Sequence, residues 1–291
     1  TIRPFALTEE EVAAAPEGLQ VAKMTGKGLE ALKFTMAVSP MDCMGCGVCV
    51  GECPAKEKAI KMVPRESQEY KQPVFDYLVA NVGKKEGMPA KETVKGSQFE
   101  KPLLEFSGSC AGCAETAYAR LITQLFGDRM YISNEQVVPL SGVVNTVNEK
   151  GHGPAWANSL FEDNAEHGFG MYLGQKVLRD KLIEEVRDVV ENGSNEAVKA
   201  AGQKYLDTVN NGKENQAATE ELIAALEACG CEKAKSILAH KEYLAKKSVW
   251  VFGGDGWAYD IGFGGLDHVL ASGEDVNVMV FDTEVYSNTG G

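Results

Sequence analysis

The chain has 291 residues, which is enough for one large or two ordinary domains. Hydrophobic residues make up 44% of it and charged residues 24%, as in a soluble globular protein, and no apolar run approaches the roughly 20 residues of a membrane-spanning helix. A net charge of −13 argues against a nucleic-acid partner, because nucleic acids bind to basic surfaces.

The first motif is a dense cysteine run that reads C-M-G-C-G-V-C-V-G-E-C-P. Its spacing is typical of [4Fe-4S] loops, in which glycines let the backbone wrap an inorganic cluster. A zinc site uses two C-x2-C pairs set further apart, and disulfides belong to an oxidising compartment. The run therefore predicts an electron-transfer cluster held by Cys43, Cys46, Cys49 and Cys53.

The last cysteine of the run leaves two alternatives open. In two-cluster ferredoxins the fourth cysteine binds the other cluster, and this chain has no second run. Cys53 then either completes its own cluster or pairs with a run that precedes residue 1. The opening Thr1–Pro4 echoes Ala59–Pro64, so we expect the start to be a cut inside a pseudo-repeat. The cysteine usage and the absence of a signal peptide predict a cytoplasmic protein.

Composition divides the chain into three parts. Residues 1–66 are expected to form the second half of a ferredoxin-like domain, and the polar residues 67–102 a linker or wrapping segment. Residues 103–291 are expected to form a second domain, with an apolar strand over 103–106 and a helix over 114–125.

A helical insertion is predicted at about 173–247. Its first helix carries an apolar stripe at helical spacing, and Gly193 is placed to end that helix. The stripe comprises Val177, Leu178, Leu182, Ile183, Val186, Val189 and Val190. The later pair Cys229 and Cys231 either binds metal or lies at a helix end as small apolar residues, and the second is the more common case.

The C-terminal part reads as a strand, a helix and a strand, over 248–252, 257–271 and 276–281. Such a unit has parallel strands, and ligands bind at their carboxyl ends. One strand ends in G-D-G and the other in a polar loop, so we expect the two loops to face each other. Oxygens of Asp255, Thr283 and Val285 suit Mg²⁺, which usually keeps substrate phosphates as further ligands.

The glycines beside Asp255 let the backbone approach a diphosphate, at the start of the expected helix. G-D-G followed about 30 residues later by Asn288 resembles the thiamine diphosphate motif. The alternative is a plain strand–helix–strand unit in which Asp255 only caps the helix. We therefore predict an α/β fold: a thiamine diphosphate-binding parallel-sheet domain preceded by a partial ferredoxin-like domain.

A lone C-x2-C at Cys110 and Cys113, with Glu115 beside it, is ambiguous among zinc, a redox dithiol and a cluster. Next to the other two motifs, a cluster is the sensible interpretation. Together the motifs resemble the C-terminal part of the pyruvate:ferredoxin (flavodoxin) oxidoreductase family. The resemblance rests on residues 43–54, 108–120, 153–166 and 253–291.

The resemblance implies oxidative decarboxylation of pyruvate to acetyl-CoA and CO2, with coenzyme A as co-substrate and with ferredoxin or flavodoxin as electron acceptor. It implies a homodimer and further domains of the same enzyme. Cys43, Cys46 and Cys49 would hold one cluster, Cys53 another, and Cys110 and Cys113 part of a proximal one. The implied thiamine diphosphate contacts are Glu115, Gly254, Asp255, Gly256, Trp257, Thr283, Glu284, Val285, Tyr286, Ser287 and Asn288, and the implied Mg²⁺ ligands are Asp255, Thr283 and Val285.

The chain departs from the family at two points. The family has a Thr-Gly-Cys triple where residues 135–150 contain no Cys, and a usual glycine is Ala114 here. The resemblance places a further cluster ligand beyond Gly291. It places the Glu that activates thiamine diphosphate and the Arg that binds the substrate in an N-terminal domain that this chain lacks. The chain alone is therefore expected to be inactive. Two rivals remain: an oxidoreductase for another 2-oxoacid, and a non-catalytic electron-transfer module.

Overall fold

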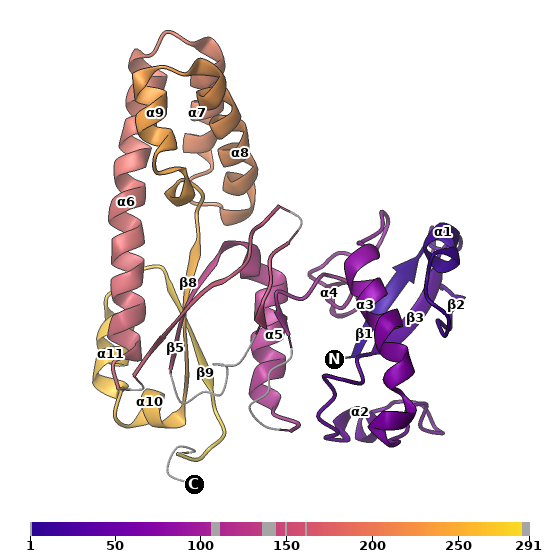
Figure 1. The fold of residues 1–291 in the computed structure, drawn as a ribbon. Coiled ribbons are helices and arrows are strands. Elements are labelled where there is room, and N and C mark those ends of the chain that lie inside the picture. The colour runs from indigo at the N-terminus through magenta and orange to yellow at the C-terminus, as the bar shows by residue number, and fades with distance from the viewer. Residues whose placement is uncertain (1, 106–110, 136–143, 149, 161, 287–291) are drawn as a thin grey trace. The chain divides into compact units, whose positions relative to one another are not determined.

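The computed structural model describes residues 2–105, 111–135, 144–148, 150–160 and 162–286 (Figure 1). The chain forms two units. Unit 1 comprises Thr1–Gly127 with Pro139–Gly151, and unit 2 comprises Asp128–Val138 with His152–Gly291. The boundaries predicted from composition, at residues 66 and 102, remain a prediction.

Unit 1 is built on a small antiparallel sheet of order β1-β3-β2 and a two-stranded ladder of β4 and β6. The register of the sheet runs from Ile2 opposite Val38 to Leu7 opposite Lys33. The strands are β1 (Ile2–Leu7), β2 (Ala22–Lys23), β3 (Lys33–Val38), β4 (Leu104–Glu105) and β6 (Val144–Asn145). The helices are α1 (Glu9–Ala13), α2 (Val48–Gly51), α3 (Gln72–Asn81), α4 (Val94–Ser97) and α5 (Ala114–Phe126), with short 3-10 turns at Arg65–Ser67 and Glu69–Lys71.

Part of the core of unit 1 comes from residues 67–102. Helix α3 carries Val74 and Leu78, which pack against Phe5 and Leu7 of β1. The ring of Phe75 meets that of Phe5 edge to face, at 6.4 Å between centroids. Burial of these side chains fixes α3 on the sheet, because each large apolar side chain removed from water contributes roughly 1.5–3 kcal/mol.

Unit 2 contains a four-stranded parallel sheet of order β7-β5-β8-β9 (Figure 1). Its strands are β5 (Met130–Glu135), β7 (Ala155–Ser159), β8 (Ser248–Gly254) and β9 (Val276–Phe281), and a 3-10 turn at Gly127–Arg129 precedes β5. The predicted α/β class and the parallel pairing of the last two strands are thereby confirmed. Strands β8 and β9 are rich in Val, as is typical of parallel strands.

The predicted helix over 257–271 is two helices, α10 (Asp255–Tyr259) and α11 (Phe263–Ala271). The chain breaks between them because the backbone N–H groups of Asp260 and Ile261 both return to the carbonyl of Gly256. Gly262 then passes so close to the ring of Trp257 that a side chain there would lie 2.3 Å from Cδ1. The prediction of one continuous helix over 257–271 was therefore wrong.

The helices α6 (Asn164–Asn192), α7 (Glu196–Asp207), α8 (Gly212–Cys229) and α9 (Glu232–Leu238) lie between β7 and β8, followed by a 3-10 turn at Lys241–Tyr243. Helix α6 starts earlier than predicted and packs on the sheet before it reaches the other helices (Figure 1). Val177 and Leu178 of the predicted stripe are 68% and 40% exposed, because they lie on the part of α6 outside the helical core. The helix ends at Gly193, as predicted.

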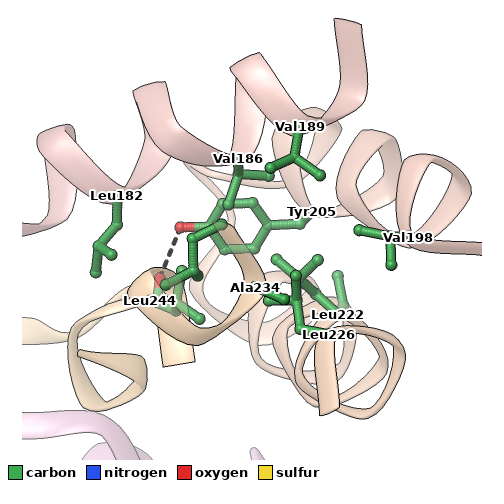
Figure 2. Packing of buried hydrophobic residues seen from close by; sticks show 11 residues of the cluster. Leu182, Val186, Val189, Val198, Tyr205, Leu222, Leu226, Ala234 and Leu244 are labelled. Carbon is green, nitrogen blue, oxygen red and sulfur yellow. Dashed lines mark hydrogen bonds between the residues drawn. The ribbon is translucent and has the colours of Figure 1, made fainter. Parts of the chain in front are cut away.

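The helical core of unit 2 surrounds Tyr205 (Figure 2). Its ring is fully buried, and its hydroxyl donates a 2.9 Å hydrogen bond to the carbonyl of Leu244. The side chains around it include Leu182, Val186, Val189, Val198, Leu222, Leu226 and Ala234. Within the described segments, no helix combines the length and apolar character needed to cross a bilayer.

Candidate cofactor and cluster sites

The loops after β8 and β9 meet at the carboxyl edge of the parallel sheet. The carboxylate of Asp255 accepts the backbone N–H of Thr283 at 2.9 Å and its hydroxyl at 2.6 Å, both on Oδ2. The same hydroxyl lies 3.4 Å from the carbonyl oxygen of Val285. The structure thus brings together the three predicted Mg²⁺ ligands, although their metal-binding role remains a prediction.

The chemistry of this group of oxygens suits a hard divalent cation. It offers a carboxylate, a hydroxyl and a backbone carbonyl, which are donors that Mg²⁺ prefers. Asp255 is 8% exposed. A second carboxylate, Asp282, lies alongside: hydrogen bonds from the Tyr259 hydroxyl and from the Glu284 N–H lower its pKa. Two adjacent acidic side chains give the loop a negative potential that a cation would offset.

Glycines make the close approach of the two loops possible. A side chain at Gly253 would lie 2.3 Å from the ring of Trp257, and one at Gly256 would lie 2.4 Å from the ring of Tyr286. Both distances are shorter than any contact a real Cβ tolerates. A larger residue at position 256 would push the two loops apart, and one at position 253 would displace Trp257. Glu284 adopts a left-handed backbone with φ of 62°, an uncommon state for a residue that is not glycine.

The other predicted thiamine contacts are placed as follows. Trp257 is fully buried in the core of unit 2. Gly254 is the last residue of β8, and its N–H donates a hydrogen bond to the carboxylate of Glu135. Glu115 lies half-buried in the first turn of α5, in unit 1. Ser287 and Asn288 lie outside the described residues.

A carboxylate that the sequence did not single out also reaches this loop. Oε2 of Glu135, at the end of β5, accepts the backbone N–H of Gly254 at 2.7 Å. Glu135 is 5% exposed. The one available signal was its position, since it follows the apolar start of β5 at the ligand-binding edge of a parallel sheet.

A buried polar network supports the same edge. The amide of Asn164 donates to the carbonyl of Phe252 at 2.8 Å, and its Oδ1 accepts the hydroxyls of Ser133 at 2.7 Å and Ser159 at 3.0 Å. One side chain thereby connects β5, β7 and β8. His167 adds a 2.7 Å hydrogen bond to the Ser133 hydroxyl. The network fixes the strand ends from which the loops emerge.

The cysteine run lies in unit 1 around α2. Gly45 and Gly47 both adopt left-handed backbone, with φ of 68° and 76°, as expected of a loop that turns tightly. Cys43, Cys46 and Cys49 are exposed, whereas Cys53 is buried. A cavity of about 710 Å³ is lined by Cys43 and Cys49 together with apolar residues of β3 and of the segment after the run.

The environment of Cys53 favours its thiolate. Backbone N–H groups of Ala55 and Ala59 lower the pKa of the Cys53 thiol, and the N–H of Ala59 lies 3.4 Å from its sulfur. The thiolate is the form that binds metal. Among the described residues, no three side chains of His, Cys, Asp or Glu converge on a common metal position, so the cluster-ligand roles remain predictions.

The second cysteine motif lies beside the first. A side chain on Gly112 would contact Cβ of Cys46 at 3.6 Å and Cγ2 of Val48 at 3.1 Å. Cys113 is half-buried at the start of α5. Cys110 lies outside the described residues. The two motifs, separated in the chain, are therefore neighbours within unit 1.

Comparison with known proteins gives a consistent set of relatives. No protein-family model matches the chain. It is 49% identical over 298 aligned residues to the pyruvate-flavodoxin oxidoreductase of Klebsiella pneumoniae and 48% identical over 304 residues to that of Enterobacter agglomerans. It is 47% identical over 311 residues to the pyruvate:ferredoxin oxidoreductase of Moorella thermoacetica. These alignments cover 100% of this chain but only 25%, 26% and 26% of the relatives, so the chain spans about a quarter of their length.

Proposed function

We propose that this chain, which is homologous over its whole length to about a quarter of the pyruvate:ferredoxin and pyruvate-flavodoxin oxidoreductases, performs two tasks of such an enzyme. It binds Mg²⁺ and thiamine diphosphate, and it passes electrons through [4Fe-4S] clusters. In this proposal the complete enzyme oxidatively decarboxylates pyruvate, transfers the acetyl group to coenzyme A and reduces ferredoxin or flavodoxin. The observation that carries the proposal is the meeting of Asp255, Thr283 and Val285 at the carboxyl edge of the sheet.

In the cofactor site, Asp255, Thr283 and Val285 would hold Mg²⁺, which would supply positive charge for the diphosphate. Gly256 of the G-D-G turn allows the two loops to stay in contact, and Asn164 bonds to the end of β8. Bound thiamine diphosphate supplies an electron sink that stabilises the carbanion produced when a 2-oxoacid loses CO2. The contribution of this chain is to bind the cofactor and to orient it.

In the cluster sites, the cysteine run binds [4Fe-4S] through Cys43, Cys46 and Cys49, and Cys53 serves the same or a second cluster. The neighbouring motif contributes Cys113, with Cys110 as the other ligand of a proximal cluster. The closeness of Gly112 to Cys46, where an added Cβ would lie 3.6 Å from the Cys46 Cβ, supports a short electron path between the two motifs. The lowered pKa of Cys53 supports a role as a metal ligand, because a larger fraction of this thiol is deprotonated and the thiolate is the form that binds metal.

One observation favours the alternative of a non-catalytic electron-transfer module. The Glu135 carboxylate already occupies the N–H of Gly254, which is one of the backbone donors that a diphosphate could use. A negative charge at that point also repels phosphate. In this alternative the parallel sheet is only a scaffold for the iron–sulfur unit.

Titration calorimetry separates the two functions. The chain and the complete enzyme are titrated with thiamine diphosphate, with and without Mg²⁺. Binding that requires Mg²⁺ supports the cofactor role, and no binding by either protein in the presence of Mg²⁺ supports the scaffold. Iron and acid-labile sulfide are measured after anaerobic reconstitution to test the clusters. Assays of the complete enzyme with several 2-oxoacids then test the assignment of pyruvate.

A further inference from the structure

Two cysteines outside the candidate sites lie in contact. Cys229 ends α8 and Cys231 precedes α9, with Gly230 between them. Their sulfur atoms are 3.1 Å apart, about 1 Å longer than the S–S bond of a disulfide. The pair belongs to unit 2, whereas the cysteines of the predicted cluster loops belong to unit 1.

The turn between the helices brings the sulfurs together. Gly230 adopts left-handed backbone with φ of 61°, which reverses the chain at the end of α8. Helix α9 then returns to the helical core, where Ala234 and Ile237 are buried. Both ends of the turn are thus anchored in the helical core, which keeps the two cysteines close together.

The two thiols differ in exposure and in acidity. Cys231 is exposed, and Cys229 is half-buried against the helical core. A hydrogen bond with the Cys229 thiol and the backbone N–H of Ala234 lower the pKa of Cys231. The thiolate is the nucleophile in thiol–disulfide exchange, so Cys231 is suited to attack and Cys229 to resolve the product.

We propose that Cys229 and Cys231 form a reversible dithiol–disulfide site that reacts with small-molecule disulfides such as oxidised glutathione. The Cys231 thiolate attacks one sulfur of the oxidant, forms a mixed disulfide and releases one glutathione thiolate. The Cys229 thiolate then attacks Cys231 Sγ, closes the internal disulfide and releases the second glutathione. The protein loses two electrons and two protons, and the oxidant becomes two thiols.

A metal site fits these residues less well. Structural zinc takes four ligands, and among the described residues no third His, Cys, Asp or Glu joins the two sulfurs. The proposal does not depend on the cofactor and cluster sites, because none of their residues takes part in the exchange.

The test uses the full chain, reduced and then treated with oxidised glutathione under anaerobic conditions. Acid quenching, blocking of free thiols and tryptic digestion follow. Cleavage after Lys213 and Lys233 releases a peptide that contains both thiols of the pair and no other cysteine. We expect this peptide to be lighter than its reduced form by two hydrogen atoms and to carry no glutathione. A wild-type peptide that stays reduced, or that carries two glutathiones, overturns the proposal.

Single substitutions test the two roles. Cys229→Ser should trap glutathione on Cys231, because the resolving thiol is gone. Cys231→Ser should take up glutathione on Cys229 at a rate at least fivefold lower, because that thiol is less exposed. Equal uptake by the two variants contradicts the assigned order of attack.

The turn provides a matched pair of control variants. Gly230→Ala should close the internal disulfide about fivefold more slowly, because alanine resists left-handed backbone. Gly230→Asn should close at nearly the wild-type rate, since asparagine tolerates that conformation. Equal closure rates for all three proteins contradict a geometric origin of the reactivity. Circular dichroism confirms that each variant keeps its helices.

Discussion

The backbone N–H of Gly254 donates a 2.7 Å hydrogen bond to Oε2 of Glu135, so a buried carboxylate holds the residue that precedes Asp255. The two partners are 119 positions apart in the chain. The contact has two opposite consequences for a diphosphate ligand. It fixes the turn that carries Asp255, the proposed Mg²⁺ ligand, and it places a negative charge beside a backbone donor that we propose for the diphosphate.

Replacement of Glu135 by Gln separates these consequences. The amide oxygen of Gln can still accept the Gly254 N–H, while the charge is removed. Thiamine diphosphate with Mg²⁺ should bind about tenfold more tightly, which corresponds to loss of a repulsion of roughly 1.4 kcal/mol. Calorimetry provides the measurement, and Glu191→Gln, at an exposed position on α6, is the control. Weaker binding by Glu135→Gln would mean that the carboxylate itself assists the cofactor.

Asp255→Asn should abolish most of the Mg²⁺-dependent binding. The side chain keeps its shape but loses the charge that the cation needs, and loss of an interaction of about 3 kcal/mol weakens binding roughly 100-fold. The measurement is the thiamine diphosphate affinity at a fixed Mg²⁺ concentration. Asp267→Asn, at an exposed position on α11, should bind as the wild type does. An unchanged affinity in Asp255→Asn rejects the metal assignment.

Thr283→Val tests the hydroxyl ligand separately from the fold. Valine keeps the branched shape and the backbone N–H that bonds to Asp255, and it removes only Oγ1. Mg²⁺ affinity should fall about tenfold, on the scale of one hydrogen bond to a charged group. Thr283→Ser restores a hydroxyl and should recover most of the affinity. If serine fails to recover it, the hydroxyl is not a ligand and the effect comes from packing.

The sequence was most informative where chemistry is local. Two apolar strands, each followed by a polar glycine-bearing loop, were sufficient to predict that Asp255 and Thr283 would face each other. The approach of Glu135 to Gly254 depends on β5 pairing with β8, which only the complete sheet determines. The exposure of Val177 was also beyond prediction, because a helical stripe does not reveal how far along α6 the partner helices extend.

Cys46→Ser tests the cluster in the cysteine run. A serine oxygen is a poor substitute for thiolate in an iron–sulfur site, so the variant should bind less iron and sulfide after anaerobic reconstitution. Electron paramagnetic resonance of the reduced protein should lose the signal of one cluster. Cys229→Ser, at the dithiol pair, should retain the wild-type iron content and signals. A full set of signals in Cys46→Ser contradicts its ligand role.

Tyr205→Phe measures the polar contact in the helical core. The Leu244 carbonyl that accepts the Tyr205 hydroxyl also accepts Nε of Arg179 at 3.0 Å, so it keeps one partner in the variant. The free energy of unfolding should therefore fall by only about 1 kcal/mol near neutral pH. Urea unfolding followed by circular dichroism gives the value. Tyr70→Phe is the control, because the Tyr70 side chain is 61% exposed and its substitution should have little effect.

Tyr205→Phe should also differ from the wild type in how its free energy of unfolding depends on alkaline pH. Burial raises the pKa of Tyr205, an effect that Arg179 partly opposes. In the unfolded chain a tyrosine ionises near pH 10, whereas the buried hydroxyl stays protonated, so the folded state binds more protons. The wild type should consequently lose stability as the pH rises above about 10, whereas Tyr205→Phe lacks this contribution. The difference in unfolding free energy between the two proteins should shrink with rising pH. A difference that stays constant between pH 8 and about 11 would mean that Tyr205 ionises equally in the folded and unfolded chains.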